Sequence, residues 1–378
     1  PPRRGTDPMA ARPAVRRPLG STRSADVPQR PIVRDLTRGG ASLRIDWDVR
    51  SAYDFVFSLS GEAGSTDDLP AADRKWLTAS RKALHPDARA GVAALFESEL
   101  AIHAGVLIVD QPDVRTASDF VDYVAATTPD DLLAALLTDD QQDVDVAALI
   151  ERAIAGDASA IPSLSDKLPD WHKKGRLELL RDPKLAKDRV VMVLRAWQAK
   201  FAEVEPRVQA ILERDYDSRA GDRERLSPAD LIETTTGGLR YLPESGITRV
   251  ILGPSYFSRP YNFLMSSHDW RFFGYPVSDA ALDPVDELTP PLSVVRLHRA
   301  LGDGTRLRIL KLLASRDLYL TEIAQELDLS KPTIKHHLSQ LRAAGLVTIT
   351  EAGTVLYYSL RRNRLDDAAV EIKRYLVG

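Results

Sequence analysis

The chain has 378 residues, of which 44% are hydrophobic and 28% charged, and it contains no cysteine. This length predicts two folded domains plus an extra segment, and the composition is that of an ordinary globular protein. The lack of cysteine excludes a disulfide framework, a thiolate metal site and a cysteine nucleophile. No apolar run approaches the roughly 18 to 20 residues that span a bilayer, and the N-terminus lacks the apolar core of a signal peptide. We therefore expect a cytoplasmic protein without a membrane partner.

Charge is distributed unevenly along the chain, whose formal net charge is −3. Residues 1–40 carry a net charge of +6 and residues 291–378 carry +5, so the stretch between them carries −14. A basic end attached to an acidic body is expected when one module meets a polyanion and the other does not.

The acidic body is predicted to be mostly helical. Residues 1–38 precede it, and they form a tail that is rich in Pro and Arg and is expected to be disordered. Strict alternation over 43–49 predicts a half-buried strand, and Ser51 starts a short helix that ends near Leu59. Helical periodicity then predicts helices at 70–84, 87–105, 116–126, 129–137, 143–155, 175–181 and 186–214. Pro206 should kink or split the last of these, because its ring removes a hydrogen-bond donor and clashes one turn back.

Aromatic residues gather in the segment that follows. Short runs at 247–252, 261–266 and 270–275 are predicted to be strands of a small sheet. The cluster comprises Tyr256, Phe257, Tyr261, Phe263, Trp270, Phe272, Phe273 and Tyr275. A buried core is the simplest interpretation. The alternative is a pocket for an apolar or aromatic effector, with polar groups drawn from Arg259, Asn262 and His268.

Helical periodicity resumes after a proline-rich boundary at 279–291. Helices are predicted at 294–301 and from Thr305 onward. Two more helices follow at 321–327 and 331–344, and a tight turn separates them. Ser330 caps the second of this pair and Gly345 ends it. Strands at 346–350 and 355–360 then form a hairpin around Gly353, the wing of a winged helix.

The helix at 331–344 has the character of a DNA-reading helix. Ile334, Leu338 and Leu341 recur at i, i+4 and i+7 and form one core stripe. The opposite and flanking faces carry Lys331, Thr333, Lys335, His336 and Gln340. Cations, an imidazole, a hydroxyl and an amide on one outward side are suited to base edges in a major groove. Arg342, one turn further on, is expected to touch phosphate or the module's own core.

Four segments of this module, at 301–310, 330–338, 341–347 and 357–358, resemble the ArsR (ArsR/SmtB) family of dimeric winged-helix repressors. The resemblance covers about residues 292–377. It implies a homodimer built on the first and last helices of the module. The apolar side of the last helix comprises Leu365, Val370, Ile372, Tyr375 and Leu376. The strand at 43–49 and the aromatic region at 249–276 resemble an N-terminal domain of unknown function on long actinobacterial members.

The sequence departs from the metal-sensing members of that family. The founding sensors carry a Cys-x-Cys pair where this chain has residues 318–320, Leu-Tyr-Leu. Other members place Asp and His on the last helix, which here has Asp366, Asp367 and Glu371 but no His. We therefore expect neither a metal nor a cofactor.

Three features of the sequence could be taken as a metal, catalytic or DNA-contacting site, and we favour a structural interpretation for each. Glu99 and His103 lie at i, i+4, a spacing that can bind a metal or supply an acid and a base, but a surface pair is favoured. His337 is expected to pack into the helix pair. Residues 252–256, Leu-Gly-Pro-Ser-Tyr, lack the second glycine of a nucleophile loop. No catalytic motif is present, and we predict that the chain is not an enzyme.

These observations predict an α+β chain in three parts. Residues 1–38 form the tail, residues 39–285 a mostly helical regulatory domain with a small aromatic sheet, and residues 286–378 a winged-helix domain for DNA binding and dimerisation. The predicted function is a sequence-specific repressor of an imperfectly palindromic operator, released by a non-metal small-molecule effector. The alternatives are an enzyme or effector-processing domain tethered to DNA, and a sequence-tolerant chromosome-associated protein.

Overall fold

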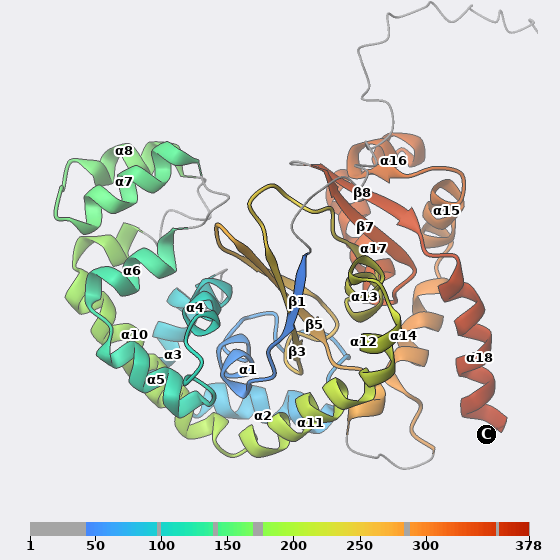
Figure 1. Cartoon of the computed structure of the whole chain (residues 1–378), viewed down its shortest axis with the longest axis horizontal. Helices are drawn as coiled ribbons and strands as arrows, with labels where there is room; N and C mark the ends of the chain where they lie inside the picture. The colour runs from blue at the N-terminus through green and yellow to red at the C-terminus, as the bar shows by residue number, and fades with distance from the viewer. Residues whose placement is uncertain are drawn as a thin grey trace, which may run out of the picture. The chain divides into compact units, whose positions relative to one another are not determined.

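The computed structural model describes residues 43–96, 100–138, 143–168, 177–282, 288–352 and 355–377. Within these ranges the chain is mostly helical and has two four-stranded sheets of mixed direction, which confirms the predicted α+β class (Figure 1). The predicted tail, Glu99 and the wing turn at Gly353 lie outside the described residues. None of the helices in these ranges is long and apolar enough to cross a membrane.

The first sheet has the strand order β1-β3-β5-β4. Its members are β1 (Arg44–Trp47), β3 (Arg249–Ser255), β5 (Trp270–Pro276) and β4 (Phe263–Ser266). The first three are parallel and β4 is antiparallel to β5. Alternate residues of β3 point to opposite faces, so Ile251 joins the main core while Val250 and Leu252 join a smaller cluster. Burial on both faces is typical of parallel sheets and explains the apolar run.

The helices of the acidic body follow most of the predicted bounds, but the prediction of one helix at 87–105 is wrong, because α3 ends at Leu95 and α4 begins at Leu100. They are α1 (Ser51–Phe57), α2 (Ala71–Lys82), α3 (Pro86–Leu95), α4 (Leu100–Val109), α5 (Ala117–Ala126), α6 (Pro129–Leu137), α7 (Val144–Ile154), α8 (Ala160–Lys167), α10 (Pro183–Phe201), α11 (Glu205–Ser218), α12 (Ala220–Arg225) and α13 (Pro228–Thr235). The predicted split near Pro206 is confirmed, because α10 ends at Phe201 and Pro206 lies in the first turn of α11. Three short helices, α8, α12 and α13, were not predicted.

The aromatic cluster is core. Tyr256, Phe257, Trp270, Phe272, Phe273 and Tyr275 are buried. The three polar residues considered for an effector pocket there have other surroundings. Arg259 is buried and donates to the carbonyls of Asp68 and Val277, Asn262 donates to the Thr236 carbonyl at 2.7 Å, and the His268 side chain is 86% exposed. The core interpretation is therefore confirmed for these six residues, whereas Tyr261 and Phe263 are half-buried.

A buried carboxylate fixes the turn that follows β3. Asp54, on α1, is fully buried and accepts hydrogen bonds from Ser255 Oγ at 2.8 Å, Tyr256 N at 3.0 Å and Phe257 N at 2.8 Å. Burial raises the pKa of Asp54 to about 6, although these hydrogen bonds favour the ionised form. The carboxylate thus ties the first helix to the segment that leads to Tyr261.

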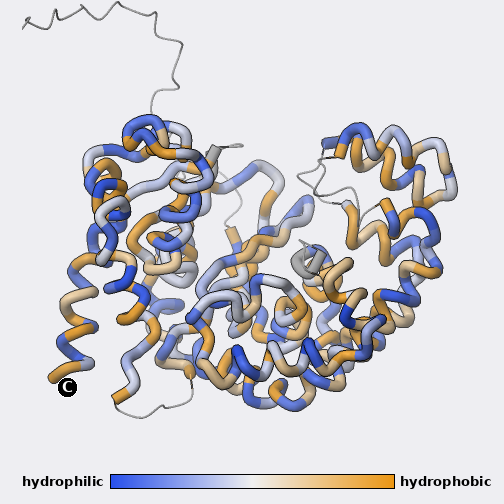
Figure 2. The backbone as a smooth tube through the Cα atoms, turned by 180° about the vertical axis from the view of Figure 1, so that it is seen from behind, coloured by the Kyte–Doolittle hydropathy of each residue, from blue (hydrophilic) through white to orange (hydrophobic). Residues whose placement is uncertain are grey.

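The C-terminal module contains α14 (Leu292–Leu301), α15 (Gly304–Leu313), β6 (Leu318–Tyr319), α16 (Leu320–Leu327), α17 (Lys331–Ala343), β7 (Val347–Ala352), β8 (Val355–Leu360) and α18 (Asn363–Val377). Its own core includes Leu297, Ile309, Ile323, Ile334, Leu338 and Leu346. Helix α18 packs against α14, and hydrophobic positions recur along it up to the C-terminus (Figure 2). Three of them, Leu365, Val370 and Leu376, are 40%, 56% and 69% exposed.

The second sheet joins the two parts of the chain. Its strand order is β2-β7-β8-β6, and β2 (Leu239–Arg240) comes from the acidic body. Strand β2 runs parallel to β7, with Leu239 opposite Ile349, and Ile349 N donates to the Gly238 carbonyl at 2.9 Å. Gly238 has φ +123°, and a Cβ there would lie 3.2 Å from the Val347 carbonyl oxygen. Only glycine adopts this positive φ and allows this close approach of the Val347 carbonyl without strain.

Candidate nucleic-acid interface

Helices α16 and α17 are held at a fixed angle by a three-residue turn. Asp328 ends α16 in the left-handed region at φ +55°, and Leu329 N donates to the Ala324 carbonyl at 3.0 Å. Ser330 then caps α17, since its hydroxyl accepts from Thr333 N at 3.3 Å. Gly345, at φ +69°, follows the end of α17 as predicted.

The buried stripe of α17 decides which side chains face outward. Ile334, Leu338 and Leu341 are at most 1% exposed, so the helix cannot rotate about its axis. Of the predicted reading residues, Lys331, Thr333, Lys335 and His336 are exposed and Gln340 is half-buried. The Thr333 hydroxyl also lies 2.7 Å from Ser330 Oγ, so it shares its hydrogen-bonding capacity with the cap. The structure thus brings these five side chains onto one helix, and four of them are exposed.

His337 points the other way. Its side chain is 14% exposed, and its Nδ1 lies 3.9 Å from Asp303 Oδ1. Asp303 caps α15 by accepting from Arg306 N at 2.8 Å, and that hydrogen bond is the main reason why the pKa of Asp303 is lowered. The expected packing of His337 into the helix pair agrees with this geometry.

The basic residues in the last turn of α17 and after β8 are held close to the protein. Arg342 is half-buried, burial lowers its pKa, and its charge faces Tyr358 of β8 and Tyr261 of the acidic body. Burial also lowers the pKa of Arg361, while Arg362 donates to the Ala314 carbonyl at 2.6 Å. Arg342 thus has surroundings in the protein interior, one of the two partners expected for it, and its expected contact with phosphate stays a prediction.

Sequence reasoning missed a set of contacts between the acidic body and the DNA-binding module. The side chain of Tyr261 lies close to Ser339 of α17, near enough to act on the pKa of the Tyr261 hydroxyl, so the aromatic segment lies beside α17. Arg299 Nη1 lies 3.2 Å from Asp67 Oδ2, and Arg296 pairs with Asp68. No local spacing connects residues so far apart. The opposite charges of the two parts were the only signal in the sequence.

The described residues contain no group of three or more His, Cys, Asp or Glu side chains that could hold a metal ion. In the positions where relatives hold metals, Leu318 is buried in β6, and Glu371 of α18 accepts a hydrogen bond from Arg364 Nη2 at 3.0 Å. These side chains already serve the protein core and an ion pair.

A reading helix presented by α16, together with the β6-β8-β7 wing, defines a winged helix-turn-helix DNA-binding domain. The family model described as "Bacterial regulatory protein, arsR family" matches residues 303–348. The chain belongs to the ArsR family of bacterial regulatory proteins, whose members bind operator DNA, typically as dimers.

Two curated regulators and one solved structure are similar in sequence to this chain. The transcriptional repressor SdpR of Bacillus subtilis is 39% identical over 72 residues, which are 19% of this chain and 80% of that protein. The regulator KmtR of Mycobacterium tuberculosis is 31% identical over 94 residues, 25% of this chain and 72% of its own length. A crystal structure from Mycobacterium bovis is described as a possible transcriptional regulatory protein, and its sequence is 32% identical to the matched part of this chain. The match covers 21% of this chain and 85% of the crystallised chain, with a TM-score of 0.19. These relatives leave most of the chain, including the acidic body, without a counterpart.

Proposed function

We propose that this regulator is a repressor that binds a specific, imperfectly palindromic operator as a homodimer and is released by a small non-metal effector. The observation that carries the proposal is the outward face of α17, where Lys331, Thr333, Lys335 and His336 are exposed opposite a fully buried stripe. Lysines neutralise phosphates, and side chains that reach base edges supply specificity. Gln340 and Arg342 complete the proposed DNA-binding set.

The proposed homodimer rests on α14 and α18. These helices pack together, and α18 keeps exposed apolar side chains at Leu365, Val370 and Leu376. Apolar positions of this kind on a terminal helix are suited to a self-complementary interface about a two-fold axis. Such symmetry requires operator half-sites whose centres lie about 10 to 11 base pairs apart.

The division into a regulatory domain at 39–285 and a DNA-binding domain at 286–378 is part of the same proposal. Two separate cores support it, one built around the acidic body and one within the last ninety or so residues. The β2 pairing with β7 and the Tyr261 contact with α17 give the first domain direct access to the reading helix and the wing.

The test is a comparison of Lys335→Ala and His336→Ala on the operator and on a random duplex, with the operator selected from a genomic library. Each change should cost roughly 1 to 3 kcal/mol on the operator and little on random DNA, because a base contact contributes only when its base is present. Lys75→Ala is the matched control, since Lys75 is an exposed lysine on α2. Arg342→Ala, if it meets phosphate, should weaken both duplexes about equally and lower the salt slope by about one unit.

Equal loss on operator and random DNA for Lys335→Ala and His336→Ala would show that α17 does not read sequence. The sequence-tolerant chromosome protein would then be the better account. Measurements at two salt concentrations are needed, because the phosphate contribution depends strongly on salt.

A further inference from the structure

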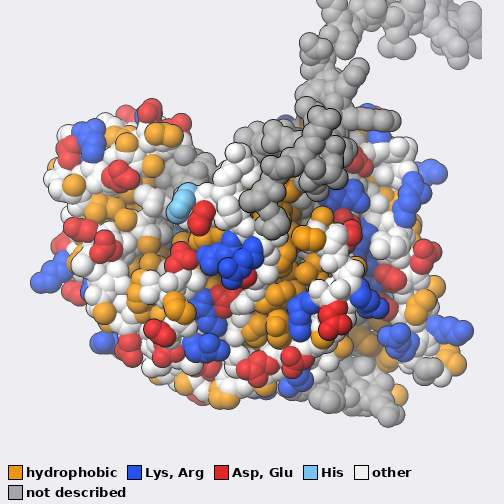
Figure 3. Space-filling model, in the orientation of Figure 1, with side chains coloured by type: hydrophobic (Ala, Val, Ile, Leu, Met, Phe, Trp, Pro, Cys, Tyr) orange, Lys and Arg blue, Asp and Glu red, His pale blue; other side chains and the backbone are white. Residues whose placement is uncertain are grey.

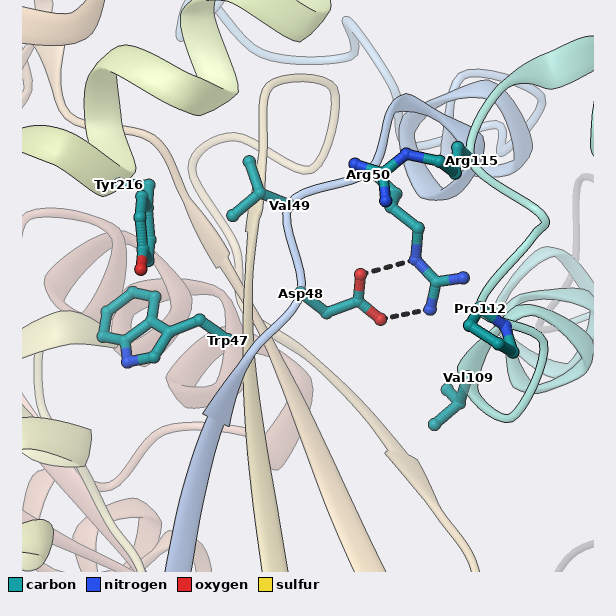
Figure 4. A pocket seen from close by; sticks show the side chains of 8 residues that line it. All are labelled: Trp47, Asp48, Val49, Arg50, Val109, Pro112, Arg115 and Tyr216. Atoms are coloured by element: carbon teal, nitrogen blue, oxygen red, sulfur yellow. Dashed lines mark hydrogen bonds and ion pairs between the residues drawn. The ribbon is translucent and has the colours of Figure 1, made fainter.

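A cavity opens at the carboxyl end of β1, and all of its lining residues belong to the acidic body (Figure 4). Its volume is about 400 Å³, which lies within the range of small-molecule sites. The lining residues are Trp47, Asp48, Val49, Arg50, Val109, Pro112, Arg115 and Tyr216.

The position of the cavity follows from the sheet topology. Strands β1 and β3 are parallel, and the chain leaves β1 at Trp47 to enter α1 at Ser51. Crevices at the carboxyl ends of parallel strands are the usual ligand sites of such sheets. Here the segment between α4 and α5 forms one wall and α11 forms the other.

One arginine that lines the cavity, Arg50, uses all of its hydrogen-bond donors within the protein. Arg50 Nε donates to Asp48 Oδ1 and Nη2 to Asp48 Oδ2, as the dashed lines of Figure 4 show. Its Nη1 donates to the carbonyls of Gln111 at 2.6 Å and Val114 at 2.9 Å, and Nη2 also reaches Tyr53 OH at 3.0 Å. All five N–H donors are therefore used. The Asp48–Arg50 pair is a neutral, rigid floor.

The second arginine is available. Arg115 is exposed, and its guanidinium forms no hydrogen bond or ion pair with any residue that the structure describes, although its charge acts on Asp119 through space. Its side chain reaches across the cavity from the α4–α5 segment toward the β1 side (Figure 4). Because the floor is neutral, Arg115 leaves the lining with a net positive charge. In the orientation of Figure 1, the visible face of the molecule carries interspersed acidic and basic groups with hydrophobic side chains between them (Figure 3).

An aromatic wall faces this cation. The rings of Trp47 and Tyr216 meet edge to face, with centroids 5.5 Å apart. The Arg223 guanidinium lies 3.8 Å from the Tyr216 centroid, a cation–π contact that stabilises the position of that ring. Val109 and Pro112 line the opposite side of the cavity (Figure 4).

We propose that this cavity binds a small aromatic carboxylate, whose ring packs on Trp47 and Tyr216 and whose carboxylate pairs with Arg115. A rigid aromatic surface next to one unpaired cation selects a flat, apolar monoanion over a neutral or cationic analogue. The idea that this ligand is the effector rests on the repressor function proposed above. The proposal of the binding site does not depend on that function.

The chain connects the aromatic wall to the wing. Tyr216 and Arg223 lie on α11 and α12, and the same segment continues through α13 into β2, which pairs with β7. A ligand that shifts Tyr216 therefore acts on a continuous stretch of helices that ends in the wing sheet. This gives the bound ligand a physical route to a change in operator affinity.

Phenylacetate is the probe and its neutral amide, phenylacetamide, is the matched control ligand. Calorimetry with the full chain and no DNA should show one phenylacetate per chain and at least about tenfold weaker binding of the amide, as expected for loss of one charge-assisted contact. Arg115→Gln should weaken phenylacetate binding by a similar factor. Arg195→Gln, which changes an exposed arginine on α10, should leave it unchanged.

Absence of binding at about 10 mM phenylacetate, or equal binding by the Arg115→Gln and Arg195→Gln proteins, would overturn the site. Equal affinity for the acid and the amide would do the same. Operator titrations with and without saturating phenylacetate then address the effector role separately. An unchanged operator affinity would overturn that role, while a failure to recognise any operator would overturn the repressor proposal and leave the cavity result standing.

Discussion

The buried carboxylate of Asp54 makes the stability of the acidic body depend on pH in an unusual direction. Its pKa is about 6 in the folded chain, against an ordinary value of 3.8. A carboxyl whose folded pKa is raised binds its proton more tightly in the folded state. Its contribution to stability is therefore complete below pH 3.8 and is lost as the pH rises through about 6.

The magnitude follows from those two values. The interval between 3.8 and about 6, at about 1.4 kcal/mol for each pH unit, corresponds to about 3 kcal/mol. Other carboxylates act in the opposite sense, since the pKa values of Asp119 and Asp303 are lowered. The measurement must therefore compare wild type with Asp54→Asn, which has no proton to exchange at this position.

Urea unfolding between pH 4 and pH 7 provides the assay. All five tryptophans, at positions 47, 76, 171, 197 and 270, precede the DNA-binding module, so their fluorescence reports on the acidic body alone. We expect wild type to gain about 2.4 kcal/mol of this relative to Asp54→Asn as the pH falls from 7 to 4, because at pH 4 the carboxyl of the unfolded chain is itself partly protonated. The exposed Asp113 offers a control, and Asp113→Asn should follow wild type throughout.

Parallel pH profiles for wild type and Asp54→Asn would refute this reasoning. So would a relative loss of wild-type stability at low pH, because it would mean that hydrogen bonds from Ser255, Tyr256 and Phe257 outweigh burial and lower the folded pKa.

Two further predictions concern the DNA-binding module. The fragment 286–378 should dimerise at micromolar concentration and bind DNA, because α14, α17 and α18 all lie within it; light scattering that finds a folded monomer would assign the dimer contact to residues 39–285. Zinc or arsenite should leave operator affinity unchanged, since the chain has no cysteine and α18 has no histidine. A stoichiometric change that a chelator reverses would contradict this expectation.

The elements that were predictable from the sequence are those with local causes. The stripe of Ile334, Leu338 and Leu341, the cap at Ser330 and the glycine at 345 all act within one or two turns, and together they place α17 correctly. Pro206 likewise marks a boundary through its own ring. Signals of this kind need no knowledge of distant residues.

The contacts that position the DNA-binding module could not be predicted, because sequence patterns report only on residues that are close together in the chain. Strand β2 has two residues, which is too short to show a period, and its partner Ile349 is more than a hundred positions away. The cavity combines Trp47 with Tyr216 and Arg115 only after the sheet and three helices have formed. The only sign of Asp54 in the sequence is a single acidic residue in the apolar run of α1. Its partners lie at and just after the end of β3, about two hundred residues later.

The pairing of β2 with β7 also determines what the wing exposes to other molecules. A strand with an open side presents a row of unpaired N–H and C=O groups, which templates addition of a strand from another chain. In the full chain β2 covers that side at Ile349 and Thr350. A protein cut before residue 286 has lost this cover, so two copies can join edge to edge through β7. Such a dimer would be a consequence of truncation, and its interface would differ from the one proposed on α14 and α18.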